Sequence, residues 1–349
     1  MGGASSSPVT GIRIPTKVAA AGKKVGNPAG KNKWSDAVTV NDKLYAIPHH
    51  AEKIMVLNQE TGAVAGIPVP TEVGSGFAKW YGGAVVDGKV YGIPSNADQV
   101  LVLDTATGEV TGIPVPDEVG SGVSKWFGGV AIDGKVYGIP HGAGQIMVLD
   151  TATGAVSGIP VPAEVASCKH GKWFGGVAVG SRLYGVPCNA NQILVLDTAT
   201  GQVSGISVPA DVGHEICQWF GGAVANSKVY GIPAFAEHIM VLDTVTGVVS
   251  GIPVPVEVGF GINKWHGGVA VDGGKFIYGI PRDADHVMVL DTSVEAVSGV
   301  AVPGKIGTGD GKWIRLAPET SAADGRVFGV PDNANHILVL DTTEGSPQS

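Results

Sequence analysis

The sequence predicts an all-β protein, a seven-bladed β-propeller with four antiparallel strands in each blade. Three observations support this prediction: a repeat of about 46 residues, a four-strand pattern inside each repeat, and two incomplete repeats at the ends that complement each other. Four short strands in a unit of this length are typical of a propeller blade, and no segment of the unit shows the helical period.

Seven tryptophans, which are all that the chain contains, mark the repeats. Each of them is expected to start a blade: Trp34, Trp80, Trp126, Trp173, Trp219, Trp265 and Trp313. We therefore expect one propeller domain over residues 9–343. Residues 1–8 are expected to form a flexible N-terminal tail, and residues 344–349 a C-terminal tail.

The second repeat illustrates the predicted strands. An Asp87-Gly88 pair favours a tight hairpin turn, and Pro94 ends a strand because proline cannot donate to a β-ladder. The four expected strands are Trp80–Val86, Lys89–Ile93, Gln99–Asp104 and Glu109–Pro114, here called a to d. An aspartate ends strand c in six repeats and is expected to form the following turn by accepting main-chain hydrogen bonds. These residues are Asp104, Asp150, Asp197, Asp243, Asp291 and Asp341.

The two ends predict how the ring closes. The last repeat stops after its strand c, at Asp341, whereas residues 9–15 resemble a strand d that nothing precedes. We expect the segment 9–15 to complete the seventh blade, because closure removes exposed sheet edges.

A Gly-Gly pair follows five of the tryptophans, and we expect it to let the a strands approach each other at the crowded axis. The first and last repeats carry Ser35-Asp36 and Ile314-Arg315 instead, so the ring is expected to be irregular at the closure.

Composition limits the classes of function. The net charge of −8 gives no reason to expect nucleic-acid binding, and no apolar run is long enough to span a membrane. Three cysteines leave one unpaired under any pairing, which favours a reducing compartment and hence the cytoplasm. Met1–Ser6 fits the pattern for N-myristoylation at Gly2, which predicts weak membrane association. The alternative is an unmodified Gly/Ser tail.

The string "VDGKVYGIP" followed by "VLVLDTATGEVTGIPVP" resembles kelch-type and streptogramin-lyase-type propeller repeats, and the resemblance extends over residues 9–343. The kelch-type resemblance implies a binding or scaffolding module. The lyase-type resemblance implies a metal-assisted centre near the axis, but the His/Glu set of those enzymes has no residue-by-residue match in this sequence. Fold resemblance alone does not decide between the two.

The loops between strands b and c and between blades share one face, the top face, and differ most among the repeats. The position directly after strand b is the most variable, and we expect it to surround the channel mouth as a ligand-binding surface. The alternative is drift at an exposed loop. Arg282 and Asp332 fall in neighbouring blades and are able to pair. The seven residues are His49, Ser95, His141, Cys188, Ala234, Arg282 and Asp332.

A lysine precedes six of the tryptophans, and Gln218 stands at the seventh position. Cations on one face of an acidic protein predict attraction of an anionic partner; the alternative is that each lysine pairs with a loop carboxylate such as Glu72. The predicted anion-facing residues are Lys79, Lys125, Lys172, Lys264 and Lys312, and Lys33 precedes the first tryptophan.

Cysteines and histidines gather in the top loops of the fourth and fifth blades: Cys168, His170, Cys188, His214 and Cys217. Such residues are able to bind zinc, but their spacing matches no zinc motif. We therefore expect ordinary thiols, no bound metal and no cofactor.

The sequence thus predicts a non-enzymatic propeller that binds a protein or another ligand through its top face. One alternative is a metal-assisted lyase or hydrolase with its site at the channel mouth. Another is a structural subunit of a larger assembly, anchored through a lipid on Gly2. The sequence gives no prediction of oligomeric state.

Overall fold

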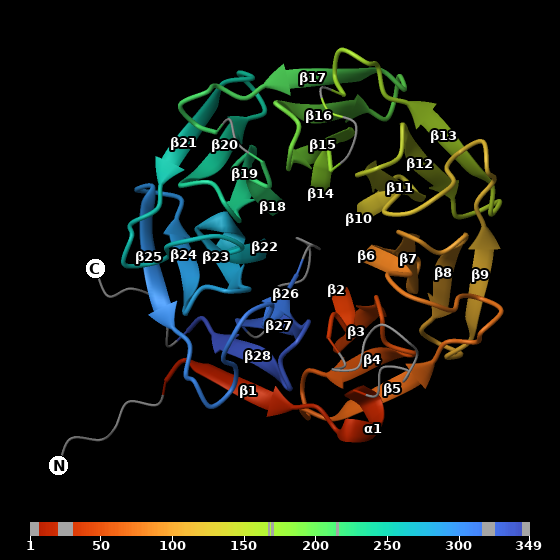
Figure 1. Ribbon diagram of the computed structural model, residues 1–349, viewed down its shortest axis with the longest axis horizontal. Coiled ribbons are helices and arrows are strands. Elements are labelled where there is room, and N and C mark those ends of the chain that lie inside the picture. The colour runs from red at the N-terminus through yellow and green to blue at the C-terminus, as the bar shows by residue number, and fades with distance from the viewer. Residues whose placement is uncertain are drawn as a thin grey trace.

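Seven four-stranded antiparallel sheets form a ring in the computed structural model, which describes residues 7–19, 31–166, 168, 171–213, 216–315 and 325–343 (Figure 1). The protein is therefore a seven-bladed β-propeller, as the sequence predicts. Within those ranges, no helix is both long and apolar enough to cross a membrane.

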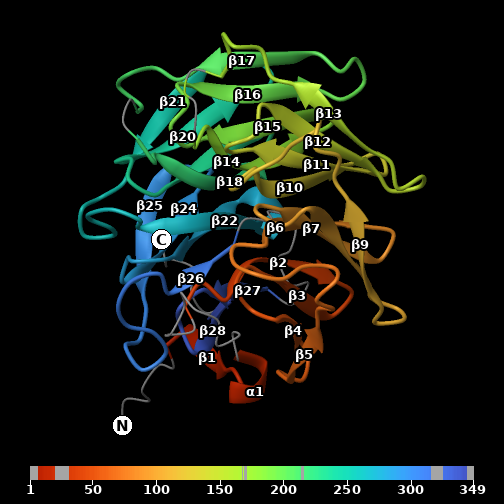
Figure 2. The ribbon, with the colours of Figure 1, turned by 45° about the vertical axis from the view of Figure 1, so that its right-hand side comes forward.

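In each blade the strands follow one another from the axis outwards, and strand a begins at the tryptophan (Figures 1 and 2). The first blade contains β2 (Trp34–Val40), β3 (Lys43–Pro48), β4 (Lys53–Asn58) and β5 (Val64–Pro68). The second contains β6 (Trp80–Val86), β7 (Lys89–Pro94), β8 (Gln99–Asp104) and β9 (Val110–Pro114). The third contains β10 (Trp126–Ile132), β11 (Lys135–Pro140), β12 (Gln145–Asp150) and β13 (Val156–Pro160). The fourth contains β14 (Trp173–Val179), β15 (Arg182–Pro187), β16 (Gln192–Asp197) and β17 (Val203–Ser207).

The remaining blades follow the same order. The fifth contains β18 (Trp219–Ala225), β19 (Lys228–Pro233), β20 (His238–Asp243) and β21 (Val249–Pro253). The sixth contains β22 (Trp265–Val271), a 3₁₀ turn (Asp272–Gly274), β23 (Phe276–Pro281), β24 (His286–Asp291) and β25 (Ala296–Ala301). The seventh contains β26 (Trp313–Ile314), β27 (Arg326–Pro331), β28 (His336–Asp341) and the N-terminal β1 (Val9–Arg13). The helix α1 (Thr16–Ala19) follows β1 and lies against β5.

The N-terminal strand closes the ring as predicted. Strand β1 pairs antiparallel with β28 from Val9 opposite Leu340 to Arg13 opposite His336. Figure 1 shows it as the outer strand of the last blade. The strand ends at Arg13, two residues earlier than expected, because Ile14 leaves the ladder and its amide donates to the Asn335 carbonyl at 3.0 Å.

Each tryptophan packs between two neighbouring blades and is fully buried. Trp80, for example, packs with Val38 and Ile47 of the first blade and with Leu101 of its own blade. Its indole Nε1 donates to the carbonyl oxygen of Gln99 at 2.8 Å, and the other six make the equivalent bond. Burying each indole with its single donor satisfied explains why tryptophan recurs with the period of the blade.

The Gly-Gly pairs allow close approach near the axis, as expected. Gly82 has a φ of +85°, and a Cβ there would lie 2.5 Å from the Cα of Gly128 in the next blade. Asp36 and Arg315 occupy this position in the first and last blades, so opposite charges stand where the ring closes. Burial lowers the pKa of Arg315 to about 10, and the negative charge of Asp36 opposes that shift.

The aspartates at the ends of the c strands form turns, as predicted. Asp104 Oδ1 accepts hydrogen bonds from the main-chain amides of Ala106 and Thr107, at 3.0 and 3.1 Å. These bonds stabilise the carboxylate, so they lower the pKa of Asp104.

We expect Gly82→Ala to destabilise the propeller more than Gly108→Ala. Both glycines have a positive φ, 85° and 78°, but no atom lies within 4 Å of a Cβ at Gly108. The control substitution adds backbone strain alone, about 1–2 kcal/mol, whereas Gly82→Ala adds a clash of about 1–3 kcal/mol more. Chemical denaturation measures both values. Equal losses would show that the blades do not need this close approach.

Candidate functional site

The residues that follow strand b form a closed ring around the channel mouth. We call this set the mouth ring: His49, Ser95, His141, Cys188, Ala234, Arg282 and Asp332. Main-chain hydrogen bonds link its members through the residues that precede the tryptophans. The amide of Ser95 donates to the Lys79 carbonyl at 2.8 Å, and the amide of Lys79 donates to the His49 carbonyl at 3.0 Å. The same alternation of main-chain hydrogen bonds continues around all seven blades. It joins the last blade to the first, where the Lys33 amide donates to the Asp332 carbonyl at 3.1 Å.

The mouth ring is more enclosed than an exposed loop. Ser95, Cys188, Ala234 and Asp332 are at most 4% exposed, and the other three members are half-buried. The alternative that this position is an exposed loop is therefore wrong for those four residues. The main-chain hydrogen bonds between blades hold the loop in place, and the four side chains are buried. Whether the mouth ring binds a ligand stays a prediction.

Aromatic side chains fill the axis beneath the mouth ring. They come from the residues directly after the tryptophans, and we call them the axial cluster: Tyr81, Phe127, Phe174, Phe220 and His266. Their ring centroids lie 4.2 Å apart for Tyr81 and Phe127 and 4.4 Å apart for Phe174 and Phe220. His141 of the mouth ring stacks on Phe127 at 3.9 Å. The sequence analysis missed this cluster, although the repeated Trp-aromatic-Gly-Gly pattern could have indicated it.

A chain of polar contacts connects the axial cluster to the mouth ring. Arg282 Nη1 lies 3.3 Å from His266 Nδ1, and His266 Nε2 lies 3.4 Å from the hydroxyl of Tyr81. Because a guanidinium only donates, Nδ1 is the acceptor, and the Nε2–H donates to Tyr81. Arg282 Nη2 also lies 3.7 Å from Asp332 Oδ2, so the expected pair between neighbouring blades is confirmed.

Burial shifts the acid–base properties of this chain. It raises the pKa of Asp332 to about 6, although the positive charges of Arg282 and Lys33 oppose the shift. Burial and the charge of Arg282 lower the pKa of His266, and burial lowers the pKa of His49 to about 3. Both histidines are therefore neutral at physiological pH, whereas the guanidinium of Arg282 brings a positive charge to the mouth ring.

The prediction that the lysines before the tryptophans form a cationic surface is wrong, because these side chains are only 1–3% exposed. Buried ammonium groups cannot form a surface ring of cations. Main-chain oxygens accept from these groups: Lys125 Nζ, for example, donates to the carbonyl oxygens of Ala97 and Gly122 at 3.0 and 3.1 Å. Burial lowers the pKa of Lys33 and of Lys264 to about 8. The lysines still carry a charge at neutral pH, and that charge binds the top loops together.

The cysteine cluster is described only in part, because His170 and His214 lie outside the described residues. Cys188 Sγ lies 3.7 Å from Asn189 Oδ1, and the neighbouring Cys188 thiol lowers the pKa of the more exposed Cys217 to about 7. No three His, Cys, Asp or Glu side chains among the described residues are grouped so that they could hold a metal ion.

Exposed apolar side chains stand at the tips of the top-face loops between blades. Four lie three residues before a tryptophan, and Phe260 lies close to one of them in sequence. We call this set the apolar rim: Phe77, Val123, Ile216, Phe260 and Ile262, which are 41%, 73%, 68%, 84% and 60% exposed. The sequence analysis missed them, although the same position carries Lys31 and Asp310 in other blades and so varies strongly.

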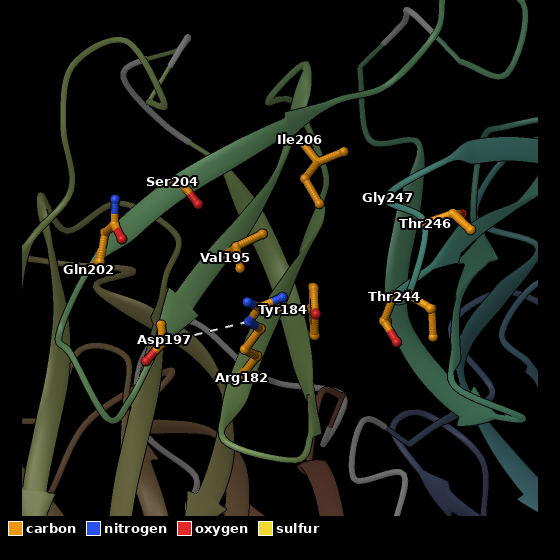
Figure 3. Close-up of a pocket in the computed structure, with 11 residues that line it drawn as sticks. Arg182, Tyr184, Val195, Asp197, Gln202, Ser204, Ile206, Thr244, Thr246 and Gly247 are labelled. Carbon is orange, nitrogen blue, oxygen red and sulfur yellow. Dashed lines mark ion pairs between the residues drawn. The ribbon is translucent and has the colours of Figure 1, made fainter.

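A separate cavity of about 340 Å³ lies between the fourth and fifth blades, next to the turn Thr244–Gly247 (Figure 3). Arg182 and Asp197 point towards each other in it, with Nε and Oδ2 3.8 Å apart. Because the Arg182 side chain is 54% exposed, solvent screens this pair and it contributes little. The cavity opens beside a c–d turn, so it is on the face opposite the mouth ring.

No protein-family model matches the sequence, and no curated protein matches it. Among solved structures, a streptogramin B lyase has a TM-score of 0.70 and 17% identity, with 95% of this chain and 96% of that chain covered. A catalytically inactive virginiamycin B lyase from Staphylococcus aureus with quinupristin has a TM-score of 0.69 and 14% identity, with 95% and 98% covered. The RRP9 WD40 repeats have a TM-score of 0.68 and 8% identity, with 97% and 98% covered. Identities this low show the propeller fold alone, shared by an enzyme and by WD40 proteins.

We expect the free energy of unfolding to fall as the pH rises from about 4 to about 6, because of Asp332. Its pKa is about 6 in the folded protein and 3.8 ordinarily, so in this window the folded state holds a proton that the unfolded state has lost. The loss from this group amounts to at most about 3 kcal/mol. Urea unfolding at several pH values measures it.

Asp332→Asn removes the titrating group and keeps its shape, so the variant should lack this part of the pH dependence. Asp98→Asn, on an exposed position of another b–c loop, is the matched control and should keep it. Parallel pH curves for the wild type and Asp332→Asn would contradict the shifted pKa.

Proposed function

We propose that this protein is a binding propeller that recognises a partner protein through its top face. The observation that carries the proposal is the apolar rim, whose five side chains are 41–84% exposed although each could have been polar at a loop tip. Exposed apolar side chains that recur on one face of a protein commonly mark an interaction surface, and four of these five occupy the same position of the top-face loops in different blades. The alternative is that these side chains are scattered at the surface and have no binding role. It does not explain why four of them occupy the same position of the repeat.

The mouth ring forms the polar centre of this proposed surface. His49, His141 and Arg282 are half-buried at the mouth, above an axis that the axial cluster fills. The partner would therefore meet a shallow surface rather than an open channel. Arg282, held by Asp332 at 3.7 Å, is a preorganised donor for a carboxylate or carbonyl group of that partner. Arginine in such an enclosed position is typical of binding hot spots.

The alternatives remain predictions. The lyase structures share the fold at 17% and 14% identity, which supports no activity for this chain. A metal-assisted reaction needs a donor set, and none of three or more members is present in the ranges that the structure describes. A lipid-anchored subunit depends on Gly2, which lies outside those ranges.

Replacement of three apolar-rim side chains by serine should weaken partner binding strongly. We expect the combined variant Phe77→Ser, Val123→Ser and Ile262→Ser to weaken binding of a co-purified partner at least a hundredfold, because exposed anchors of this size contribute about 1–2 kcal/mol each. Isothermal titration calorimetry with the purified partner measures the affinity. The unfolding midpoint should change little because these side chains are exposed.

The control replaces three exposed apolar side chains by serine on the opposite face: Val245→Ser, Val248→Ser and Val294→Ser, at residues 81%, 61% and 70% exposed. It should bind as the wild type does. Arg282→Gln should weaken binding about tenfold or more if the mouth ring is the centre of the surface. Unchanged affinity in the rim variant, or equal losses in both triple variants, would disprove recognition through the top face.

A further inference from the structure

Two of the three cysteines occupy positions that the repeat brings together between neighbouring blades. Cys188 belongs to the mouth ring of the fourth blade, and Cys217 lies two residues before the tryptophan of the fifth. The amide of Gln218, the residue after Cys217, donates to the carbonyl oxygen of Cys188 at 3.1 Å. The amide of Cys217 itself donates to Oδ1 of Asn189, the residue after Cys188, at 2.7 Å. Two hydrogen bonds therefore hold the segment around one cysteine against the segment around the other.

The scaffold, and not the thiols, sets this arrangement. The residue two before the tryptophan has a positive φ in every blade, 55° at Cys217 and 51° at Ser124. The Ser124 amide also makes the equivalent bond, to Asn96 Oδ1 at 2.8 Å. A thiol stands at both positions only between the fourth and fifth blades. The other six junctions carry His49 with Ala78, Ser95 with Ser124, His141 with Gly171, Ala234 with Asn263, Arg282 with Gly311, and Asp332 with Asn32.

The two cysteine side chains also share one part of the core. Cys188 is 2% exposed and belongs to a hydrophobic cluster, and the partly exposed Cys217 packs against the same cluster. Cys168 packs against a different cluster. A disulfide needs Cα atoms no more than about 7 Å apart, a condition that a main-chain hydrogen bond beside both residues favours. The positions of Cys188 and Cys217 are therefore suited to a disulfide between blades.

The thiols differ in reactivity. The neighbouring Cys188 thiol lowers the pKa of Cys217 to about 7, so a large share of Cys217 is thiolate at neutral pH. Contact with Cys217, together with burial, raises the pKa of Cys188, and burial raises the pKa of Cys168. Peroxides oxidise the thiolate rather than the thiol. Redox-sensitive cysteines typically combine a low pKa, exposure to solvent and a second cysteine nearby. Cys217 has all three properties.

We propose that Cys188 and Cys217 form a reversible disulfide when the protein is exposed to a peroxide. The Cys217 thiolate attacks one oxygen of hydrogen peroxide: an S–O bond forms, the O–O bond breaks, and the departing hydroxide takes a proton to become water. The sulfur of Cys188 then attacks the sulfur of the resulting sulfenic acid. The S–S bond forms as the S–O bond breaks, and the departing hydroxide takes the Cys188 proton to become a second water. The two thiols are oxidised to one disulfide, and the peroxide is reduced to water.

The disulfide joins the mouth ring to the loop between the fourth and fifth blades. That loop carries Ile216 of the apolar rim, directly before Cys217. The inference nevertheless goes beyond the proposed recognition through the apolar rim and does not require it, because the chemistry of the two thiols alone decides it. Excess dithiol restores both thiols by exchange.

Treatment of the reduced full-length protein with hydrogen peroxide, followed by mass spectrometry, tests the proposal. We expect the intact mass to fall by the mass of two hydrogen atoms. A protease digest without reductant should contain one linked pair of peptides, those with Cys188 and Cys217, and dithiothreitol should separate them. Linkage of Cys168 to either cysteine, or a protein that stays reduced or gains only oxygen, would overturn the proposal.

Variants with counterparts in other blades separate the two roles. Cys217→Ser introduces the residue that Ser124 provides in the third blade, and it should slow the reaction with peroxide about tenfold or more because the thiolate is lost. Cys188→Ala introduces the residue that Ala234 provides in the fifth blade. It should still react, but stop at the sulfenic acid, which dimedone traps. Cys168→Ser is the control and should form the disulfide at the wild-type rate.

Two outcomes of the variant experiments contradict the assigned roles. One is an equal loss of rate in Cys168→Ser and Cys217→Ser, which would mean that Cys217 is not the reacting thiol. The other is equal trapping of sulfenic acid in the wild type and in Cys188→Ala, which would mean that Cys188 does not complete the disulfide.

Discussion

The amide of the residue before each tryptophan is the point at which one blade is tied to the next. It donates to the carbonyl of the mouth-ring residue in the preceding blade, while its own carbonyl accepts from the mouth-ring residue in the same blade. The tryptophan beside it is fully buried between the same two blades. Main-chain bonds do not depend on side-chain identity, so the ring keeps its geometry while the mouth-ring side chains vary. This separation lets a repetitive scaffold carry a non-repetitive surface.

Much of the fold follows from local chemistry that is visible in the sequence. The tryptophan period, the Asp-Gly turns and the strand-like segment 9–15 predict the blades and the closure, because each depends on contacts that recur in every repeat. The end of β1 at Arg13 was not predicted, since it depends on a bond from Ile14 to Asn335 that occurs only at the closure. The same limit applies to Asp36 and Arg315. The sequence shows that the Gly-Gly pair is missing at these positions, but the attraction between the two charges arises only when the first and last blades meet.

The candidate site was less predictable because burial, rather than residue type, decides what its side chains do. Lysines usually lie at the surface, so a row of them indicated a cationic face. In the folded protein main-chain carbonyls accept hydrogen bonds from these buried ammonium groups, and for Lys79, Lys125 and Lys264 the carbonyls come from two loops. The pairing of Arg282 with Asp332 was foreseen because the repeat places the two at equivalent positions of adjacent blades. The contacts of Arg282 with His266 and of His266 with Tyr81 join different positions of the repeat, so the spacing of the repeats does not reveal them.

The closure by β1 also governs the order in which the chain is able to fold. Val9 pairs with Leu340, which the ribosome adds 331 residues later. At usual rates of synthesis this delay is roughly 20 to 70 seconds, and for that time the first strand has no partner. The first six blades need no residue beyond Trp313 for their own sheets, so they are able to form while the chain is still being made. The last blade then exposes the edge of β28 until β1 docks, and this interval is when the nascent protein is most open to pairing with another copy or to capture by a chaperone.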